Sequence, residues 1–267
     1  DGLSSSVYVL LPILAQHFGL GFSQIGLIRA AHSGAMWLLE IPAGILSERV
    51  GERRLLVLGL TGAGVGYLTM SLANGYHGIL LALLIAGCGA AFQHSLCSSL
   101  IAGAFEGPDR RVALGTYNAS GDTGKLLFTG IASVLFGFQV GWQGLAAGYG
   151  FVALTAAGIL WFVLRAIKKS SAIPATLHAR TVVGGWGVRD RMGFVTLASI
   201  VFLDIAVQDG FLVFVAFLMV AKQVHPALAA FAVVATLAGG VCGKFACGHL
   251  AARLGVVRSL VLVQSLT

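Results

Sequence analysis

The sequence predicts an all-α membrane protein, a bundle of helices that cross a lipid bilayer. Two observations support this prediction. Of the 267 residues, 57% are hydrophobic and only 10% are charged, whereas soluble domains carry roughly 25% charged residues. Apolar stretches of about 20 residues, the length that a helix needs to cross a bilayer, recur along the whole chain. They are too long and too evenly apolar for the alternating strands of a membrane barrel.

Each expected span is an apolar run that ends at a polar or glycine-containing turn, where a helix is free to stop. In chain order the spans are 1–18, 23–46, 55–73, 78–104, 112–138, 143–164, 193–221, 226–251 and a ninth that starts near Val256. The first span has no visible beginning and the ninth has no visible end. We therefore expect both ends of the sequence to be truncations of a longer protein.

The placement of Lys and Arg sets the expected orientation, because cations are retained on the cytoplasmic side of a membrane. The turns after the even-numbered spans, and the long connector, hold Arg49, Arg53, Arg54, Arg110, Arg111, Arg165, Lys168, Lys169, Arg180, Arg189, Arg191, Arg253 and Arg258. The short turns at 19–22, 74–77 and 139–142 hold no Lys or Arg, and Lys222 is the single outside charge near a span end. These turns after even-numbered spans are expected to be cytoplasmic. The net charge of +7 is thus a topology signal, and nucleic acid is not an expected partner.

The chain contains a parallel internal repeat. Residues 44–54 (GILSERVGERR) and 248–258 (GHLAARLGVVR) share Gly, Leu, Arg, Gly and Arg at the same five positions. The pairs Asp1-Gly2 and Asp209-Gly210 match in the same register, with one short gap. We expect a six-helix unit over 1–165, a cytoplasmic connector over 166–191, and the start of a second unit over 192–267, with helices seven, eight and the start of nine.

The first copy of this repeat resembles the signature G-x-L-a-D-r-x-G-r-r, which lies between helices two and three of the major facilitator superfamily. The matching residues are Gly44, Leu46, Glu48, Arg49, Gly51, Arg53 and Arg54, with Glu48 in place of the usual Asp. Glu52 stands where a basic residue is usual. The resemblance covers the whole chain. It implies a major-facilitator-type helical bundle of two parallel six-helix halves, with the second half truncated, and a gating role for the signature loop.

Four further strings are similar to the fosmidomycin-resistance group of bacterial exporters. They lie at residues 26–34, 41–49, 92–100 and 113–125. This resemblance implies a multi-pass protein of the bacterial cytoplasmic (inner) membrane that confers antibiotic resistance by efflux. The antiporter motif of helix five is only half present, because Gly115, Gly121 and Gly124 occur without the expected Pro. Antiport therefore does not follow from that motif.

Ionisable groups at membrane depth are costly unless they are paired or solvated, so each is a candidate functional group. In the fifth span Asn118, Asp122, Lys125 and Thr129 follow one another at steps of four, three and four, which places them on one helical face. Asp122 and Lys125 are expected to pair. The stripe either lines a wet cavity or forms a structural ion pair between helices.

The second span repeats this spacing with Arg29, Ser33, Met36 and Glu40, and His32 lies beside them. Arg29 is close enough to the outer end to extend its guanidinium to the interface instead of serving a site. Glu40 lies deeper in the span. It is a candidate proton carrier, because an apolar environment disfavours the charged form of a carboxylate, or it forms a fixed pair with a neighbouring cation.

Other intramembrane polar residues are scattered over four spans. His94 is either a hydrogen-bonded packing residue or a proton relay. Asp204 and Asp209 lie in span seven, and Asp1 is the repeat mate of Asp209. Lys244 in span eight is expected to pair with an acid, for which Asp209 is a hypothesis. These residues complete the predicted substrate and proton pathway.

Small residues indicate packing instead of chemistry. The 37 glycines include the pairs Gly62/Gly66, Gly144/Gly148 and Gly239/Gly243, a spacing that lets helices approach closely. The four cysteines, none of them in a CxxC pair, are Cys88, Cys97, Cys242 and Cys247. We therefore expect no metal site, no redox dithiol and no cofactor.

The first hypothesis for function is a secondary active transporter that exports small organic molecules by proton antiport and alternating access. Asp122 or Glu40 is the expected proton carrier, and Arg29 and Lys125 suit an anionic substrate such as a fosmidomycin-like phosphonate. The expected partners are the lipid bilayer, a small-molecule substrate and protons, and a monomer is expected. The alternatives are an uptake symporter of the same fold and a membrane receptor that does not transport. No enzyme is expected, because HExxH and GxSxG motifs are missing from the sequence.

Overall fold

The computed structural model describes residues 2–170, 191–254, 258, 261–262 and 265, and every regular element in these ranges is an α-helix. This confirms the predicted all-α bundle. The helices are α1 (Gly2–Phe18), α2 (Phe22–Val50), α3 (Glu52–Ser71), α4 (Tyr76–Ala104), α5 (Gly107–Gly137), α6 (Trp142–Ser170), α7 (Arg191–Ala221) and α8 (Pro226–Leu254). Most of the expected ninth span, and Asp1, lie outside the described residues.

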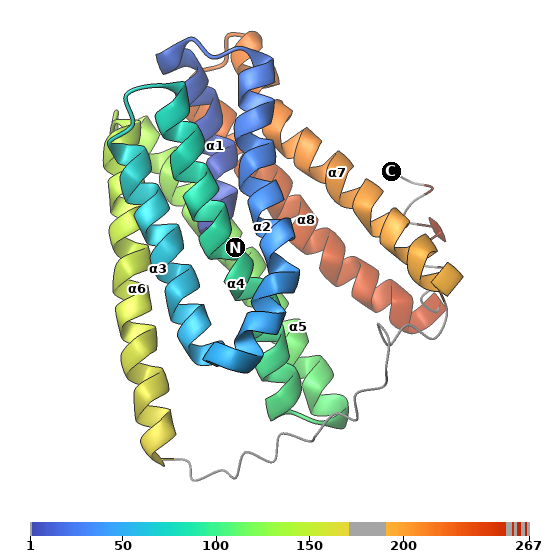
Figure 1. The fold of residues 1–267 in the computed structure, drawn as a ribbon. Coiled ribbons are helices and arrows are strands. Elements are labelled where there is room, and N and C mark those ends of the chain that lie inside the picture. The colour runs from blue at the N-terminus through green and yellow to red at the C-terminus, as the bar shows by residue number, and fades with distance from the viewer. Residues whose placement is uncertain (1, 171–190, 255–257, 259–260, 263–264, 266–267) are drawn as a thin grey trace.

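Consecutive helices run in opposite directions, and they pack around α1 (Figure 1). On one side α3 packs between α4 and α6, and α2 packs on α4; on the other side α7 and α8 pack together. α5 contacts both α1 and α8, and α1 contacts α7, so these pairs join the first six helices to the last two. The turns without Lys or Arg lie at one end of the bundle, and the basic turns lie at the other (Figure 1).

The helices run past several of the expected span ends. α2 continues to Val50 and α6 to Ser170, so basic residues such as Arg49 and Arg165 belong to helices and not to loops. Three helices in the described part of the chain, α4, α6 and α7, are long and apolar enough to cross a membrane by length and composition. α1 has only 17 residues. α2 and α5 contain the ionisable residues of the two polar stripes predicted from the sequence. The division into two halves remains a prediction.

Glycines set the distance between α3 and its two neighbours. A Cβ atom built on Gly66 would lie 2.6 Å from the Ala86 nitrogen of α4, and one on Gly59 would lie 2.7 Å from the Gly89 carbonyl oxygen. On the opposite face, a Cβ atom on Gly64 would lie 3.1 Å from the Gly150 carbonyl oxygen of α6. The three helices therefore pack backbone against backbone, as small residues permit in membranes.

The corner between α2 and α3 depends on the signature glycine. Only Gly51 separates the two helices, and its φ of +93° lies in the left-handed region that favours glycine. Its N–H donates to the Ser47 carbonyl oxygen at 2.9 Å, which closes the end of α2. The backbone conformation at this corner therefore explains why the signature has a glycine at this position.

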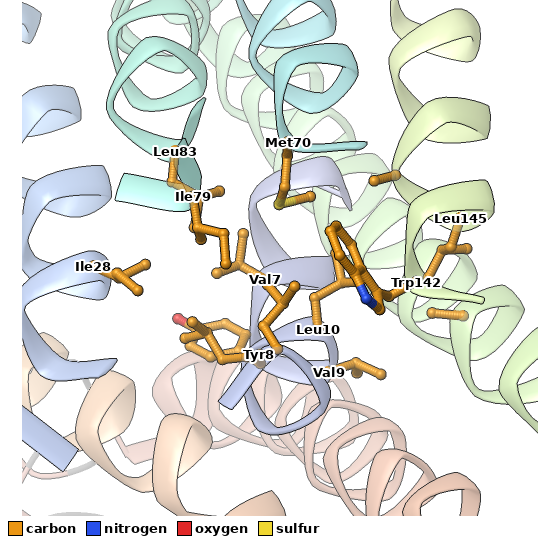
Figure 2. Close-up of a cluster of buried hydrophobic side chains, with 14 of the residues drawn as sticks. Val7, Tyr8, Val9, Leu10, Ile28, Met70, Ile79, Leu83, Trp142 and Leu145 are labelled. Carbon is orange, nitrogen blue, oxygen red and sulfur yellow. The ribbon is translucent and has the colours of Figure 1, made fainter. Parts of the chain in front are cut away.

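α1 forms the centre of the hydrophobic core. Its side chains Val7, Leu10, Leu11 and Leu14 are almost completely buried. Around them lie residues of four other helices: Ile28, Met70, Ile79, Leu83, Trp142 and Leu145 (Figure 2). The Tyr67 hydroxyl of α3 donates to the Leu3 carbonyl oxygen and lies 2.9 Å from Ser6 Oγ. α1 is therefore fixed by both apolar contact and hydrogen bonds.

We expect the substitution Gly66→Val in the whole protein to lower the thermal midpoint in detergent. Its Cβ atom alone would overlap the backbone of Ala86, and overpacking costs roughly 1–3 kcal/mol. Gly148→Val is the matched control, because a Cβ atom there meets nothing within 4 Å. Equal midpoints for the two variants would contradict the α3–α4 packing.

Candidate functional site

The most connected polar cluster joins α2 to α7 through α1. Arg29 Nη2 of α2 lies 3.0 Å from Asp209 Oδ2 of α7. The Tyr8 hydroxyl of α1 donates to Asp209 Oδ1 at 2.6 Å and accepts a hydrogen bond from Arg29 Nη2 at 2.5 Å. The guanidinium carbon also lies 4.4 Å from the centroid of the Tyr8 ring, a cation–π contact. The three side chains form a closed triangle.

This cluster is shielded from solvent. The exposed fraction of the side chain is 13% for Arg29 and 29% for Asp209, and Figure 2 shows Tyr8 within the cluster around α1. Two other donors of the guanidinium, Nε and Nη1, are buried without a hydrogen-bond partner among the described residues. A buried donor without a partner is costly. Arg29 therefore has hydrogen-bonding capacity that the described part of the chain does not use.

Aromatic side chains flank the cluster on both sides. Towards the α1–α2 turn, the ring of Phe22 lies 6.3 Å from Phe214 and 6.1 Å from Phe217. Further along α2, Trp37 lies 6.4 Å from Phe202. These contacts and the ion pair are all made by long side chains, so α2 and α7 meet without close approach of their backbones.

A second ion pair lies within α5. Lys125 Nζ is 3.0 Å from Asp122 Oδ1, which confirms the pairing predicted from their spacing. The Thr129 hydroxyl donates to the Lys125 carbonyl oxygen at 2.7 Å, so it bonds its own helix. Asp122 is buried, whereas Asn118, at the start of the predicted stripe, is exposed. The wet cavity expected along this stripe remains a prediction.

Glu40, His94 and Cys97 lie around Tyr117, a residue that the sequence analysis missed. Cys97 and Glu40 lie within electrostatic range of Tyr117. The rings of His94 and Tyr117 have centroids 6.1 Å apart, so α4 and α5 contact each other through these two side chains. The signal for Tyr117 was its place next to Asn118, within a string already singled out.

His32 lies elsewhere. Its side chain is 1% exposed, and Nδ1 lies 3.0 Å from the Leu83 carbonyl oxygen of α4. A Cβ atom built on Gly87 of α4 would collide with the His32 carbonyl oxygen. The structure therefore places His32 in the tight α2–α4 contact, although it is only three residues from Arg29.

The structure gives Arg29 a partner that the sequence did not indicate. The Arg29 side chain pairs across to Asp209 of α7, and its predicted role in the pathway remains a prediction. The described partners of Asp209 are Arg29 and Tyr8. The side chains of Lys244, Asp204 and Glu48 lie outside the described residues. Tyr8 was missed, because a tyrosine in an apolar span gives no charge signal.

The signature loop lies at the basic end of the bundle. Gly44 and Leu46 are within α2, Arg49 lies in its last turn, and Arg53 and Arg54 lie in the first turn of α3, all but Gly51 in helical conformation. The Ser47 hydroxyl donates to the Gly44 carbonyl oxygen at 2.6 Å. The gating role of this loop remains a prediction.

The sequence was compared with known proteins. The family model described as Major Facilitator Superfamily matches residues 2–267. The "Probable 4-methylmuconolactone transporter" of Cupriavidus pinatubonensis is 26% identical over 96% of this chain and 60% of its own length. The "Fosmidomycin resistance protein" of Escherichia coli is 26% identical over 62% of this chain and 37% of its own length. The "Bacillibactin exporter" of Bacillus subtilis is 29% identical over 46% of this chain and 33% of its own length. The chain thus spans 60% or less of the length of these relatives.

We expect Arg29→Met in the whole protein to lower the free energy of unfolding by about 2–3 kcal/mol, because it leaves Asp209 without its cation. The double variant Arg29→Met/Asp209→Leu should lose less than the sum of the two single variants, since no charge is left unpaired. The measurement is a double-mutant cycle of unfolding in detergent. Lys222→Met, at the exposed end of α7, is the control. Additive losses would mean that the ion pair makes no net contribution.

Proposed function

Because this chain belongs to the Major Facilitator Superfamily, we propose that the whole protein is a secondary active transporter that exports a small organic anion in exchange for protons. It would cross the inner membrane of a bacterium several times, with the basic turns on the cytoplasmic side. The proton gradient would supply the energy, and the bundle would expose its site to one side of the membrane at a time.

The observation that supports this proposal best is the unused capacity of Arg29. Its Nη2 binds Asp209 and Tyr8, while its Nε and Nη1 are buried without a partner among the described residues. A guanidinium group offers paired N–H donors to carboxylates and phosphonates. An anion that entered here would compete with Asp209 for the same cation. Binding would then weaken the contact between α2 and α7.

The names of the relatives favour the same substrate class and direction. One is named for resistance to fosmidomycin, a phosphonate, and another for transport of 4-methylmuconolactone, which carries a carboxylate. A third is named as an exporter. The first two names thus support a small organic anion as the substrate, and the third supports the outward direction.

Proton antiport requires a carboxylate that loads a proton when the substrate leaves. Glu40 and Asp122 are the candidates in α2 and α5. Glu40 has no ion-pair partner among the described residues, whereas Asp122 is held by Lys125. We propose Glu40 as the proton carrier in preference to Asp122, since a carboxylate without a paired cation can change its charge without breaking an ion pair.

A second candidate, proton symport, is favoured by the Arg29–Asp209 pair itself. If Asp209 takes up a proton, its attraction to Arg29 falls, and the freed guanidinium can bind an anion. Proton and anion would then bind together and move in the same direction. The two mechanisms predict proton fluxes of opposite sign, so one experiment separates them.

The experiment uses de-energised inverted vesicles that contain the whole protein and a pH-sensitive dye in the lumen. Fosmidomycin or 4-methylmuconolactone is added outside, at the cytoplasmic face. Antiport predicts that the lumen becomes more alkaline as substrate enters, and symport predicts that it becomes more acidic. No change of pH with any anion would overturn the proposal of proton coupling.

We expect Glu40→Gln to reduce the rate of substrate-induced alkalinisation at least tenfold, because an amide does not exchange a proton. Asp109→Asn, an exposed residue in the first turn of α5, is the matched control and should leave the rate unchanged. Retention of the signal in Glu40→Gln together with its loss in Asp122→Asn would move the proton to Asp122. Acidification that disappears in Asp209→Asn would establish the symport mechanism instead.

A further inference from the structure

A basic cavity of about 820 Å³ lies at the end of the bundle that holds the basic turns. It is formed by the corner between α2 and α3, the end of α4 and the end of α6. Four arginines line it: Arg49, Arg53, Arg54 and Arg165. They come from three helices, so the cavity is created by the fold and not by one run of sequence.

The positive charge of this cavity is not balanced within the described part of the chain. Glu52 is the one carboxylate in the lining, and its Oε1 accepts a hydrogen bond from the Ser99 hydroxyl of α4 at 2.7 Å. No ion pair links the four guanidinium groups to a described carboxylate. Four like charges around one space repel each other. An anion with several oxygen atoms would relieve this repulsion and accept the hydrogen bonds.

The start of α3 adds to this preference. α3 begins at Glu52, and no side chain caps its N-terminus, which follows directly on Gly51. The N-terminus of a helix carries a partial positive charge and free N–H groups. The N-terminus of α3 therefore attracts an anion into this cavity, as the four arginines do.

The position of the cavity favours a lipid over a soluble anion. Trp161, one turn before Arg165 in α6, is 42% exposed in the lining, and Leu100 and Leu164 form apolar walls beside it. Tryptophan is enriched at the level of lipid headgroups. On the same two helices, Phe162 of α6 and Leu58 of α3 are 70% and 58% exposed, and acyl chains can cover such apolar side chains.

The cavity also faces away from the contact between the first six helices and the last two. α3 and α6 lie on the far side of the bundle from α7 and α8 (Figure 1). The connector that follows α6 contains Arg180 and Arg189 against a single acid, Asp190, so its charge does not complement the cavity. Within the described part of the chain, α7 and α8 therefore leave this surface open to lipid.

We propose that this cavity binds the phosphate-bearing headgroup of an anionic phospholipid, with its acyl chains along α3 and α6. Basic pockets between helices on the cytoplasmic side suit such headgroups. The lipid would tie the α2–α3 corner to the end of α6, because Arg54 comes from α3 and Arg165 from α6 and both line the cavity. This inference does not depend on the substrate or on the direction of transport.

The test is native mass spectrometry of the purified whole protein, titrated with phosphatidylglycerol, with phosphatidylcholine as the zwitterionic control. The variant Arg54→Gln/Arg165→Gln removes two cavity cations. Arg110→Gln/Arg191→Gln removes two exposed cations from the same end, outside the cavity. Each variant is first checked for a wild-type thermal midpoint in detergent without added lipid, so that loss of binding is not mistaken for loss of folding.

We expect the cavity variant to raise the phosphatidylglycerol concentration for half-occupancy at least tenfold, and the control variant to change it less than twofold. Equal losses in both variants, or equal binding of the two lipids by the wild type, would overturn the proposal, since either result indicates non-specific attraction. Displacement of bound phosphatidylglycerol by millimolar inorganic phosphate would also overturn it and would assign the cavity to a free anion. If the cavity variant fails to fold, the variant Arg54→Lys/Arg165→Lys is used instead, because it keeps the positive charge. We expect it to lower the affinity for phosphatidylglycerol at least threefold, since lysine lacks the paired N–H donors of the guanidinium group.

Discussion

The ion pair between Arg29 and Asp209 is the interaction on which the arrangement of the two parts of the bundle depends. Neither charge is tolerable alone in an apolar environment, so each requires the other, and they lie on helices 180 residues apart in the sequence. Tyr8 further restricts the positions of the two charges, because its hydroxyl is hydrogen-bonded to both Asp209 and Arg29. The positions of α1, α2 and α7 are thereby linked through three side chains.

The rest of the core explains why this link is made at α1. Its central side chains are almost completely buried, and residues of α2, α3, α4 and α6 pack around them. α1 is also bonded to Tyr67 of α3 through Leu3 and Ser6. A shift of α1 would disturb all these contacts, and so Tyr8 presents its hydroxyl to Asp209 from a firmly held helix.

The sequence was sufficient for the features that depend on local spacing, and insufficient for those that depend on distant partners. The helices and the Asp122–Lys125 pair followed from hydropathy and from an i, i+3 step. Close approach was expected at three glycine pairs; among the described residues Gly62 and Gly66 lie against a neighbouring backbone, whereas a Cβ atom on Gly148, Gly239 or Gly243 meets no described atom within 4 Å. A spacing of small residues shows where helices can meet but not whether a partner is there. The partner of Arg29 was missed for the same reason, since no pattern links residues on α2 and α7.

Two kinds of helix contact coexist in this molecule, and the difference bears on movement. α3, α4 and α6 touch through glycine backbones, and such contacts cannot slide without overlap of main-chain atoms. α2 and α7 instead meet through an arginine, an aspartate and aromatic rings, whose rotamers can change while the helices stay intact. A transporter that alternates its access needs a rigid unit and an interface that can be broken and remade. In the proposed transporter the glycine-packed helices would supply the first and the side-chain contact around Arg29 would supply the second, so that a change in charge at a single carboxylate would act on the whole interface.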